Sequence, residues 1–136
     1  MSSDNKALVR AFFNSLNRDH IIPEELMGPD FRYHVAGAPP LDFEASQLRM
    51  ALFHSAFPDL THTEQDLLGE SDRVAFRSSL EMTHGGEFMG VPPTNHHVSV
   101  VEMGMVRIAD GRIVEMWGLL DIVGIMRQIG AIPSPG

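Results

Sequence analysis

The strongest structural signal in the chain lies in residues 96–121, HHVSVVEMGMVRIADGRIVEMWGLLD. Runs rich in Val, Ile and Met lie on both sides of Asp110-Gly111, and an Asp-Gly pair between two such runs is a strong short-range signal for a β-hairpin. The segment therefore predicts strands at about 96–109 and 112–120, paired antiparallel through a tight turn.

A third strand is predicted before this hairpin, at about 72–84. Its apolar and polar residues alternate, with Val74, Phe76, Leu80 and Met82 on one side and Arg73, Arg77, Ser79 and Glu81 on the other. A period of two indicates a strand with one buried and one solvated face. The Gly/Pro-rich segment 85–95 predicts a loop between this strand and the hairpin.

Helices are predicted from apolar periodicity and from cap and stop residues. Leu8, Phe12 and Leu16 recur at helical spacing, and Asp42 is a suitable N-cap for a second helix that Pro58 ends. The predicted helices cover about 4–18, the segment from Asp42 to Pro58, and 122–129, with a short extended run at 31–35 between the first two.

Helices come first and strands later, which favours an α+β fold over a parallel α/β fold. Long antiparallel strands twist and curl, and helices on the concave face can leave a cavity between helix and sheet. We therefore expect a curved, mostly antiparallel sheet whose N-terminal helices enclose an apolar pocket. A chain of 136 residues has room for one domain, expected to span 1–136.

The composition excludes several classes of function. Eighteen acidic and 10 basic residues give a net charge of −8, and no basic stripe is present for a nucleic acid. Cysteine is absent, which excludes disulfides and thiolate metal sites. The adjacent His96 and His97 point to opposite faces of a strand and cannot bind one metal ion together. No glycine-rich loop precedes a helix, as a phosphate-binding site would require. No apolar run approaches the roughly 20 residues that cross a bilayer. We expect a cytoplasmic protein without a metal or other cofactor that binds neither nucleic acid nor membrane.

Four segments have, in their order and spacing, the pattern of a known family. They are residues 33–35 (YHV), 57–60 (FPDL), 83–94 (THGGEFMGVPPT) and 107–115 (RIADGRIVE), the last followed by Trp117 and Asp121. Together they resemble the SnoaL-like polyketide cyclases over about residues 8–130. The resemblance implies the α+β cone of nuclear transport factor 2, a homodimer packed through the sheet, and closure of a polyketide ring by intramolecular aldol condensation.

The resemblance also implies that Asp121 is the proton-transfer residue. An aldol closure needs a base next to a carbonyl and an acid for the alkoxide, and one carboxylate with a pKa raised by an apolar pocket can serve both steps. Asp121 equally fits an N-cap of the last helix, where helix amides would lower its pKa. This chain departs from the family pattern at Met116, where relatives often carry His.

His34 and His84 are the other candidate catalytic residues. His34 ends the extended run before a Gly/Pro break, where it can reach a cavity mouth and donate to a developing oxyanion. His84 shares the buried parity of its strand and precedes the loop over the expected pocket. The alternatives are a satisfied edge histidine for His34 and a structural hydrogen bond to the loop for His84.

The expected substrate-binding residues are mostly apolar. Trp117 is predicted as a flat wall for a polycyclic substrate or, alternatively, as core. Arg107 can pair with an acid or a substrate carbonyl, or be an exposed strand arginine. The remaining predicted lining residues are Phe53, Phe57, Phe88, Met89 and Met116.

The sequence therefore predicts a cofactor-free cyclase, or a related carbon-acid enzyme, that acts on an apolar carbonyl-bearing small molecule. One alternative is epoxide hydrolysis or isomerisation in the same cone, although Arg107 and Asp121 lack the second acid that such hydrolases use. The other is a non-catalytic small-molecule-binding or dimerisation module. A homodimer is expected because strands 72–84 and 96–109 carry apolar residues on both faces.

Overall fold

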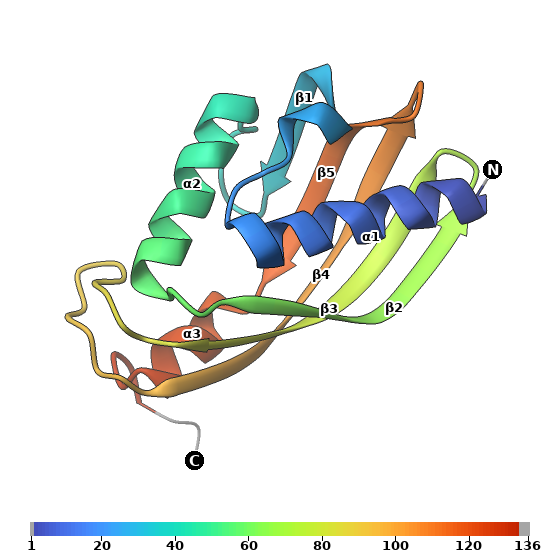
Figure 1. The fold of residues 1–136 in the computed structure, drawn as a ribbon. Helices are drawn as coiled ribbons and strands as arrows, with labels where there is room; N and C mark the ends of the chain where they lie inside the picture. The colour runs from blue at the N-terminus through green and yellow to red at the C-terminus, as the bar shows by residue number, and fades with distance from the viewer. Residues whose placement is uncertain (1, 134–136) are drawn as a thin grey trace.

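Five strands form one curved, open sheet in the computed structural model, which describes residues 2–133 (Figure 1). The strands are β1 (Met27–Val35), β2 (Thr61–Glu70), β3 (Arg73–Thr83), β4 (His97–Ala109) and β5 (Arg112–Leu120). Their order in the sheet is β1-β5-β4-β3-β2. β1 runs parallel to β5, and every other neighbouring pair is antiparallel. The predicted α+β class with a mostly antiparallel sheet is confirmed.

The β4–β5 hairpin forms where the Asp-Gly pair predicted it. Asp110 and Gly111 both have positive φ angles, 53° and 72°, as the two central residues of a type I′ turn require. A β-bulge follows in β5, because Ile108 pairs with Ile113 whereas Arg107 pairs with Glu115. The extra residue reverses the alternation of side chains along the rest of β5.

β2 is an edge strand that was not predicted as a separate element. Its side chains are largely exposed, and His62 is the single buried residue along it. Without a repeated apolar residue on one face, β2 lacks the period-two hydrophobic signal that identified β3. Its pairing with β3 therefore comes from tertiary structure rather than from its own pattern.

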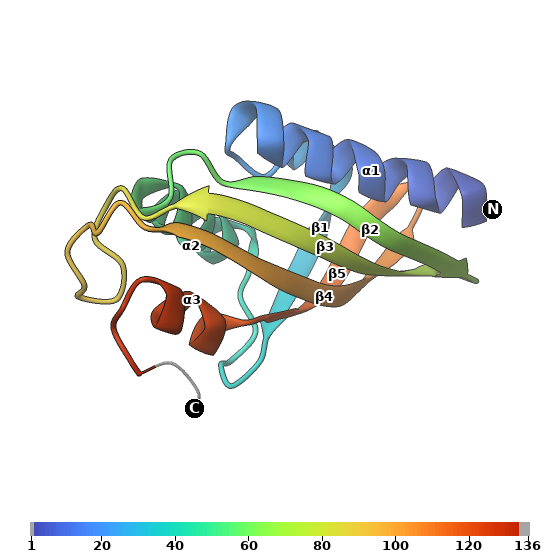
Figure 2. The ribbon, with the colours of Figure 1, turned by 90° about the horizontal axis from the view of Figure 1, so that it is seen from below.

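Three helices and a short 3-10 turn surround the sheet. The helices are α1 (Ser2–Asp19), α2 (Phe43–Ala56) and α3 (Ile122–Gln128), and the turn is η1 (Glu24–Leu26). α1 lies across β2 and β3, and α2 stands beside it on the same side of the sheet (Figures 1 and 2). The Asp42 carboxylate accepts a hydrogen bond from Ala45 N at 2.8 Å, so the predicted N-cap of α2 is confirmed.

The core has two clusters of buried apolar side chains. One lies under α1 and includes Val9, Phe12 and Leu16 together with residues of all strands but the edge strand β2. The other joins the end of α2 to α3 and to the ends of β3 and β4, with Phe57, Met82 and Ile125 fully buried. The predicted buried parity of β3 is confirmed. No helix within residues 2–133 is both long and apolar enough to span a membrane.

Candidate functional site

An inner cavity lies between α1, α2 and the concave face of the sheet. Its walls are mostly apolar and come from both core clusters, with Phe12, Leu16, Phe31, Phe53, Leu80 and Met116 among them. Four polar side chains also reach it, namely Tyr33, Arg49, His62 and Glu102. Its volume of about 40 Å³ is enough for a few water molecules. The cavity is therefore a small apolar chamber with a few polar groups.

Glu102 is a buried carboxyl group at the centre of β4. It points inward because it shares the parity of the buried residues Val98 and Val100 on the same strand. Its side chain has lost water without gaining a compensating bond from the residues described, and this burial raises its pKa to about 7, although the charge of Arg49 opposes the shift. Near neutral pH the group can therefore both accept and donate a proton.

His62 lies beside Glu102 and is uncharged at neutral pH. Its Nε2 atom is 3.9 Å from Oε1 of Glu102, beyond hydrogen-bond distance. Burial, with a smaller effect of His54, lowers the pKa of His62 to about 4, so the two side chains do not form an ion pair at pH 7. Both backbone hydrogen-bonding groups of His62 bond the Asn17 side chain at 2.8 Å, which ties the edge strand to α1.

Tyr33 and Arg49 form the other polar part of the inner cavity. Burial, assisted by the charge of Glu102, raises the pKa of Tyr33 to about 12, so its hydroxyl group stays protonated and can donate a hydrogen bond. The Arg49 guanidinium carbon lies 5.4 Å from the centroid of the Tyr33 ring and 4.8 Å from that of Phe53. These are cation–π distances.

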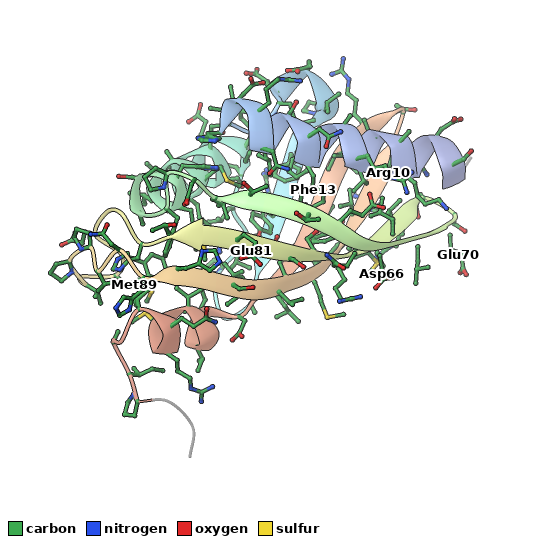
Figure 3. The ribbon with its side chains drawn as sticks, turned by 60° about the horizontal axis from the view of Figure 1, so that its bottom comes forward. Arg10, Phe13, Asp66, Glu70, Glu81 and Met89 are labelled. Atoms are coloured by element: carbon green, nitrogen blue, oxygen red, sulfur yellow. The ribbon has the colours of Figure 1, made fainter. Side chains whose placement is uncertain are left out.

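An outer chamber of about 630 Å³ adjoins the inner cavity. It lies between α2, the loop after β3 and the start of α3, and its walls include Phe88, Met89 and Ile122. Arg49 and Phe53 line both spaces and thus stand between them. Met89 lies on the loop beyond the ends of β3 and β4 (Figure 3). A volume of this size is within the usual range for small-molecule sites.

The sequence matches a known protein family. The family model of SnoaL-like polyketide cyclases matches residues 6–129, which is most of the chain. The chain belongs to this family. No curated protein matches it.

Solved structures of SnoaL-like proteins share the fold. AclR from Streptomyces galilaeus, described as a candidate hydroxylase, is 28% identical with a TM-score of 0.90, over 100% of this chain and 87% of AclR. IdmH from Streptomyces antibioticus, described as a candidate polyketide cyclase, is 34% identical with a TM-score of 0.83, over 93% and 98%. A candidate SnoaL-like cyclase from Jannaschia sp. CCS1 is 25% identical with a TM-score of 0.85, over 97% and 95%.

The predicted lining residues are divided among the two spaces and the core of this SnoaL-like protein. Met116 lines the inner cavity, and Phe53 lines both spaces. Phe88 and Met89 line the outer chamber. Phe57 is fully buried, its ring centroid 5.1 Å from that of Phe88, and it borders neither space.

Asp121 lies outside both spaces and caps α3. Its carboxylate accepts a hydrogen bond from Gly124 N at 2.8 Å, and the residue is exposed to solvent. The capping contact that the sequence offered as the alternative is therefore present. The position follows from the fold, because β5 ends at Leu120 and Asp121 is the first residue beyond the sheet.

His34, Arg107 and Trp117 lie together on the opposite face of the sheet. The carboxylate of Glu115 joins two of them, 2.6 Å from His34 Nε2 and 3.0 Å from Arg107 Nε. The Trp117 ring stacks on His34 at 5.1 Å between centroids. Although burial alone would raise the pKa of Glu115, the bonds from His34 and Arg107 hold it below its ordinary value.

The bulge in β5 explains why Trp117 points away from the cavity, whereas Arg107 points outward because its neighbours Val106 and Ile108 on β4 are buried. Beyond the bulge Met116 faces inward and Trp117 faces outward, reversing the parity expected from Ile113. In the parallel pairing, Tyr33 lies opposite Met116 and His34 lies opposite Trp117. Tyr33 thus borders the inner cavity in place of His34, and Met116 borders it in place of Trp117.

His84 is fully buried and bonds the loop that follows β3. Thr94 N–H donates to His84 Nδ1 at 3.2 Å, and the Thr94 hydroxyl oxygen lies 2.9 Å from the same nitrogen. The ring also packs 5.6 Å from that of Phe57, between centroids. These contacts are those of the structural alternative, and His84 borders neither space.

The four polar residues of the inner cavity were not chosen from the sequence. Glu102 had a signal, since a charged residue stands at a buried position in the alternation of β4. Tyr33 belongs to the motif that drew attention to His34. Arg49 and His62 carry no comparable signal, because their strand or helix does not by itself show which side chains turn inward. No group of three or more potential metal ligands occurs within residues 2–133.

Proposed function

We propose that this SnoaL-like protein is a cofactor-free cyclase, or a related carbon-acid enzyme, with Glu102 as its general acid and base. Its substrate is an apolar small molecule that carries carbonyl groups. The observation that supports the proposal is the burial of Glu102 in an apolar cavity, which raises its pKa to about 7. Proton transfer is most effective when the pKa of the catalytic group is near the working pH.

In the ring closure, the Glu102 carboxylate removes a proton from a carbon next to a carbonyl group. The resulting enolate carbon attacks a second carbonyl carbon of the same molecule, forming a carbon–carbon bond and leaving an alkoxide. The alkoxide then takes the proton back from the Glu102 carboxyl group. No electrons leave the substrate and no net proton is consumed, so the step needs no co-reactant.

Tyr33 is the proposed donor to the enolate oxygen. Its hydroxyl group is protonated at neutral pH, and burial raises its pKa further, to about 12. A positioned donor in a dry cavity stabilises developing negative charge. The neutral His62 imidazole is a further hydrogen-bonding group beside Glu102. Tyr33 and His62 are thus the proposed hydrogen-bonding groups that stabilise the negative charge of the enolate in the transition state.

The alternative hydrolase function has less support. Hydrolysis by two acids needs a second carboxyl group in the cavity, and Glu102 is the single Asp or Glu among the inner-cavity residues within 2–133. A non-catalytic binding module would not require a carboxyl group with a pKa near 7 at the centre of its cavity.

The test follows exchange of the α-protons of 2-tetralone, an apolar carbon acid, for deuterium by NMR. The wild-type chain should accelerate this exchange, and Glu102→Gln should lower the acceleration by about 10²–10⁴-fold because the amide cannot transfer a proton. Asp121→Asn is the matched control and should keep the wild-type rate. No wild-type acceleration, or full activity of Glu102→Gln, would remove Glu102 from the role.

A homodimer through the outer face of the sheet is proposed as the working form. We define the outer face as the exposed side of β3, β4 and β5 that includes Val101, Met103, Met105, Trp117 and Leu119. It contains a groove of about 400 Å³, and no helix among residues 2–133 covers it (Figure 2). An isologous contact between two such faces would bury these side chains.

A further inference from the structure

Arg49 is a half-buried cation at the junction of the inner cavity and the outer chamber, and no carboxylate within residues 2–133 pairs with it. Five other arginines each lie within 4.0 Å of an acidic side chain, namely Arg10, Arg18, Arg73, Arg77 and Arg107. The Arg49 guanidinium faces the rings of Tyr33 and Phe53 instead. It has lost part of its water without gaining a carboxylate within salt-bridge distance among residues 2–133, although its charge does act on Glu102.

The surroundings of Arg49 are those of a ligand site rather than of a surface. Phe53, Phe88 and Met89 supply apolar walls on the outer side, and Glu102 lies on the inner side. Exposed Glu87 is the acidic residue that borders the outer chamber, and it does not reach salt-bridge distance of Arg49. A planar guanidinium in such a position is suited to a planar oxyanion, which it can bind through two parallel hydrogen bonds.

We propose that Arg49 binds an oxyanion of the ligand, either a carboxylate or the enolate of a 1,3-dicarbonyl, so that the site selects acidic apolar molecules. The statement that such a molecule is the substrate rests on the proposed function, whereas the statement about binding does not. The inner cavity, at about 40 Å³, holds few atoms, and the outer chamber, at about 630 Å³, takes a ring system. Arg49 would therefore lie between the ring system of the ligand in the outer chamber and its few atoms in the inner cavity.

The net charge of −8 means that binding of an anion is not expected from the protein as a whole. A protein with 18 acidic and 10 basic residues repels anions on average, so a preference for an anion must come from a local cation. Charge-assisted hydrogen bonds to an arginine in a site with little water are worth enough to produce a preference of about tenfold or more. The preference should therefore depend on one side chain.

The experiment compares 2-anthracenecarboxylate with its methyl ester by fluorescence titration at pH 7.5. The wild-type chain should bind the carboxylate about tenfold more tightly than the ester, or better. Arg49→Met keeps the length and apolar stem, and it should remove the preference while leaving ester binding within about twofold. Arg49→Lys should keep part of the preference.

Two matched variants test the location of the charge. Arg112→Gln removes an exposed arginine outside both spaces and should change neither affinity. Glu87→Gln removes the carboxylate that borders the outer chamber and should tighten carboxylate binding without changing ester binding. The proposal is overturned if wild type shows no carboxylate preference and the enolate-forming probe dibenzoylmethane also ionises no more readily on wild type than on Arg49→Met. It is likewise overturned if wild type binds none of these probes, or if Arg49→Met keeps the preference.

A second probe separates the two oxyanions. Dibenzoylmethane forms an enolate whose absorption differs from that of the neutral form, and bound to wild type it should ionise about one pH unit lower than when bound to Arg49→Met. A shift here without a carboxylate preference assigns the enolate, and the reverse assigns the carboxylate. Repeating both titrations in Glu102→Gln separates this proposal from the catalytic one, because the dependence on Arg49 should persist there.

Discussion

Glu102 and His62 are neighbouring buried groups whose pKa shifts affect stability in opposite directions. The folded chain raises the pKa of Glu102 from 4.5 to about 7, so its contribution to stability is full below pH 4.5 and is lost as the pH rises through 7. The folded chain lowers the pKa of His62 from 6.5 to about 4, so its contribution is present above pH 6.5 and is lost as the pH falls through 4.

Replacing Glu102 by Gln should therefore stabilise the protein at high pH. The interval between 4.5 and about 7 corresponds to about 3 kcal/mol at 1.36 kcal/mol per pKa unit, and the free energy of unfolding should rise by that order at pH 8 and little at pH 4. Urea denaturation at both pH values measures the difference. An equal effect at pH 4 and pH 8 would show that Glu102 is not held as a neutral acid.

Asp121 offers a separate test of capping. Asn is about as good an N-cap as Asp, so Asp121→Asn should change the free energy of unfolding by a few tenths of a kcal/mol, whereas Asp121→Ala should cost about 1 kcal/mol. Thermal denaturation of the two variants makes the comparison. If Asp121→Asn melted normally but lost the exchange activity, the acid/base role would return to Asp121.

At the scale of the element, β4 depends on close approach of backbone and side chain at Gly104. A Cβ atom there would lie 2.6 Å from a Phe76 ring carbon and would also overlap the Trp117 carbonyl oxygen on the neighbouring strand. Gly104 pairs with Phe76 and with Gly118, so the contact lies at the middle of the sheet. Neither strand can move away without loss of its ladder.

Gly104→Ala should consequently destabilise the protein by about 2 kcal/mol or more, as overpacking in a core commonly does. Gly85→Ala is the matched control, because its nearest contact would be a Pro58 side-chain carbon at 3.3 Å, and its cost should be smaller. Chemical denaturation of both variants gives the two values. Equal stability of the pair would contradict the close approach in β4.

At the scale of the whole molecule, the outer face leaves large apolar side chains in solvent. Leu119 is 63% exposed and Met103 is 53% exposed, although both belong to central strands of the sheet. Single exposed apolar residues are ordinary on a protein surface, but Met103 and Leu119 both line the same groove. The contact expected between two copies would cover them.

Light scattering should give a mass of about twice 15.1 kDa for the wild-type chain at micromolar concentration. The double variant Met103→Asp and Leu119→Asp should give 15.1 kDa, because two opposed carboxylate pairs cannot be buried together. Leu48→Asp changes an exposed apolar residue on α2 and should leave the dimer intact. A monomeric wild type would contradict the expected assembly.

The elements that could be predicted from the sequence are those whose signals are local. The Asp-Gly turn, the alternation along β3 and the Asp42 cap each act over a few residues, and they predicted the hairpin, a buried strand face and a helix start. The four motifs predicted the family over most of the chain, because their order and spacing can be read from the sequence without knowing which residues are in contact.

The residues that border the inner cavity could not be predicted in the same way, because strand pairing selects them. One extra residue in β5 turns Met116 inward and Trp117 outward, and the parallel pairing with β1 then selects Tyr33 over His34. Arg49, His62 and Glu102 line the same cavity although they belong to a helix and two different strands. The physical reason is that a bulge and a strand register are set by pairing between segments far apart in the chain, and a local pattern contains neither.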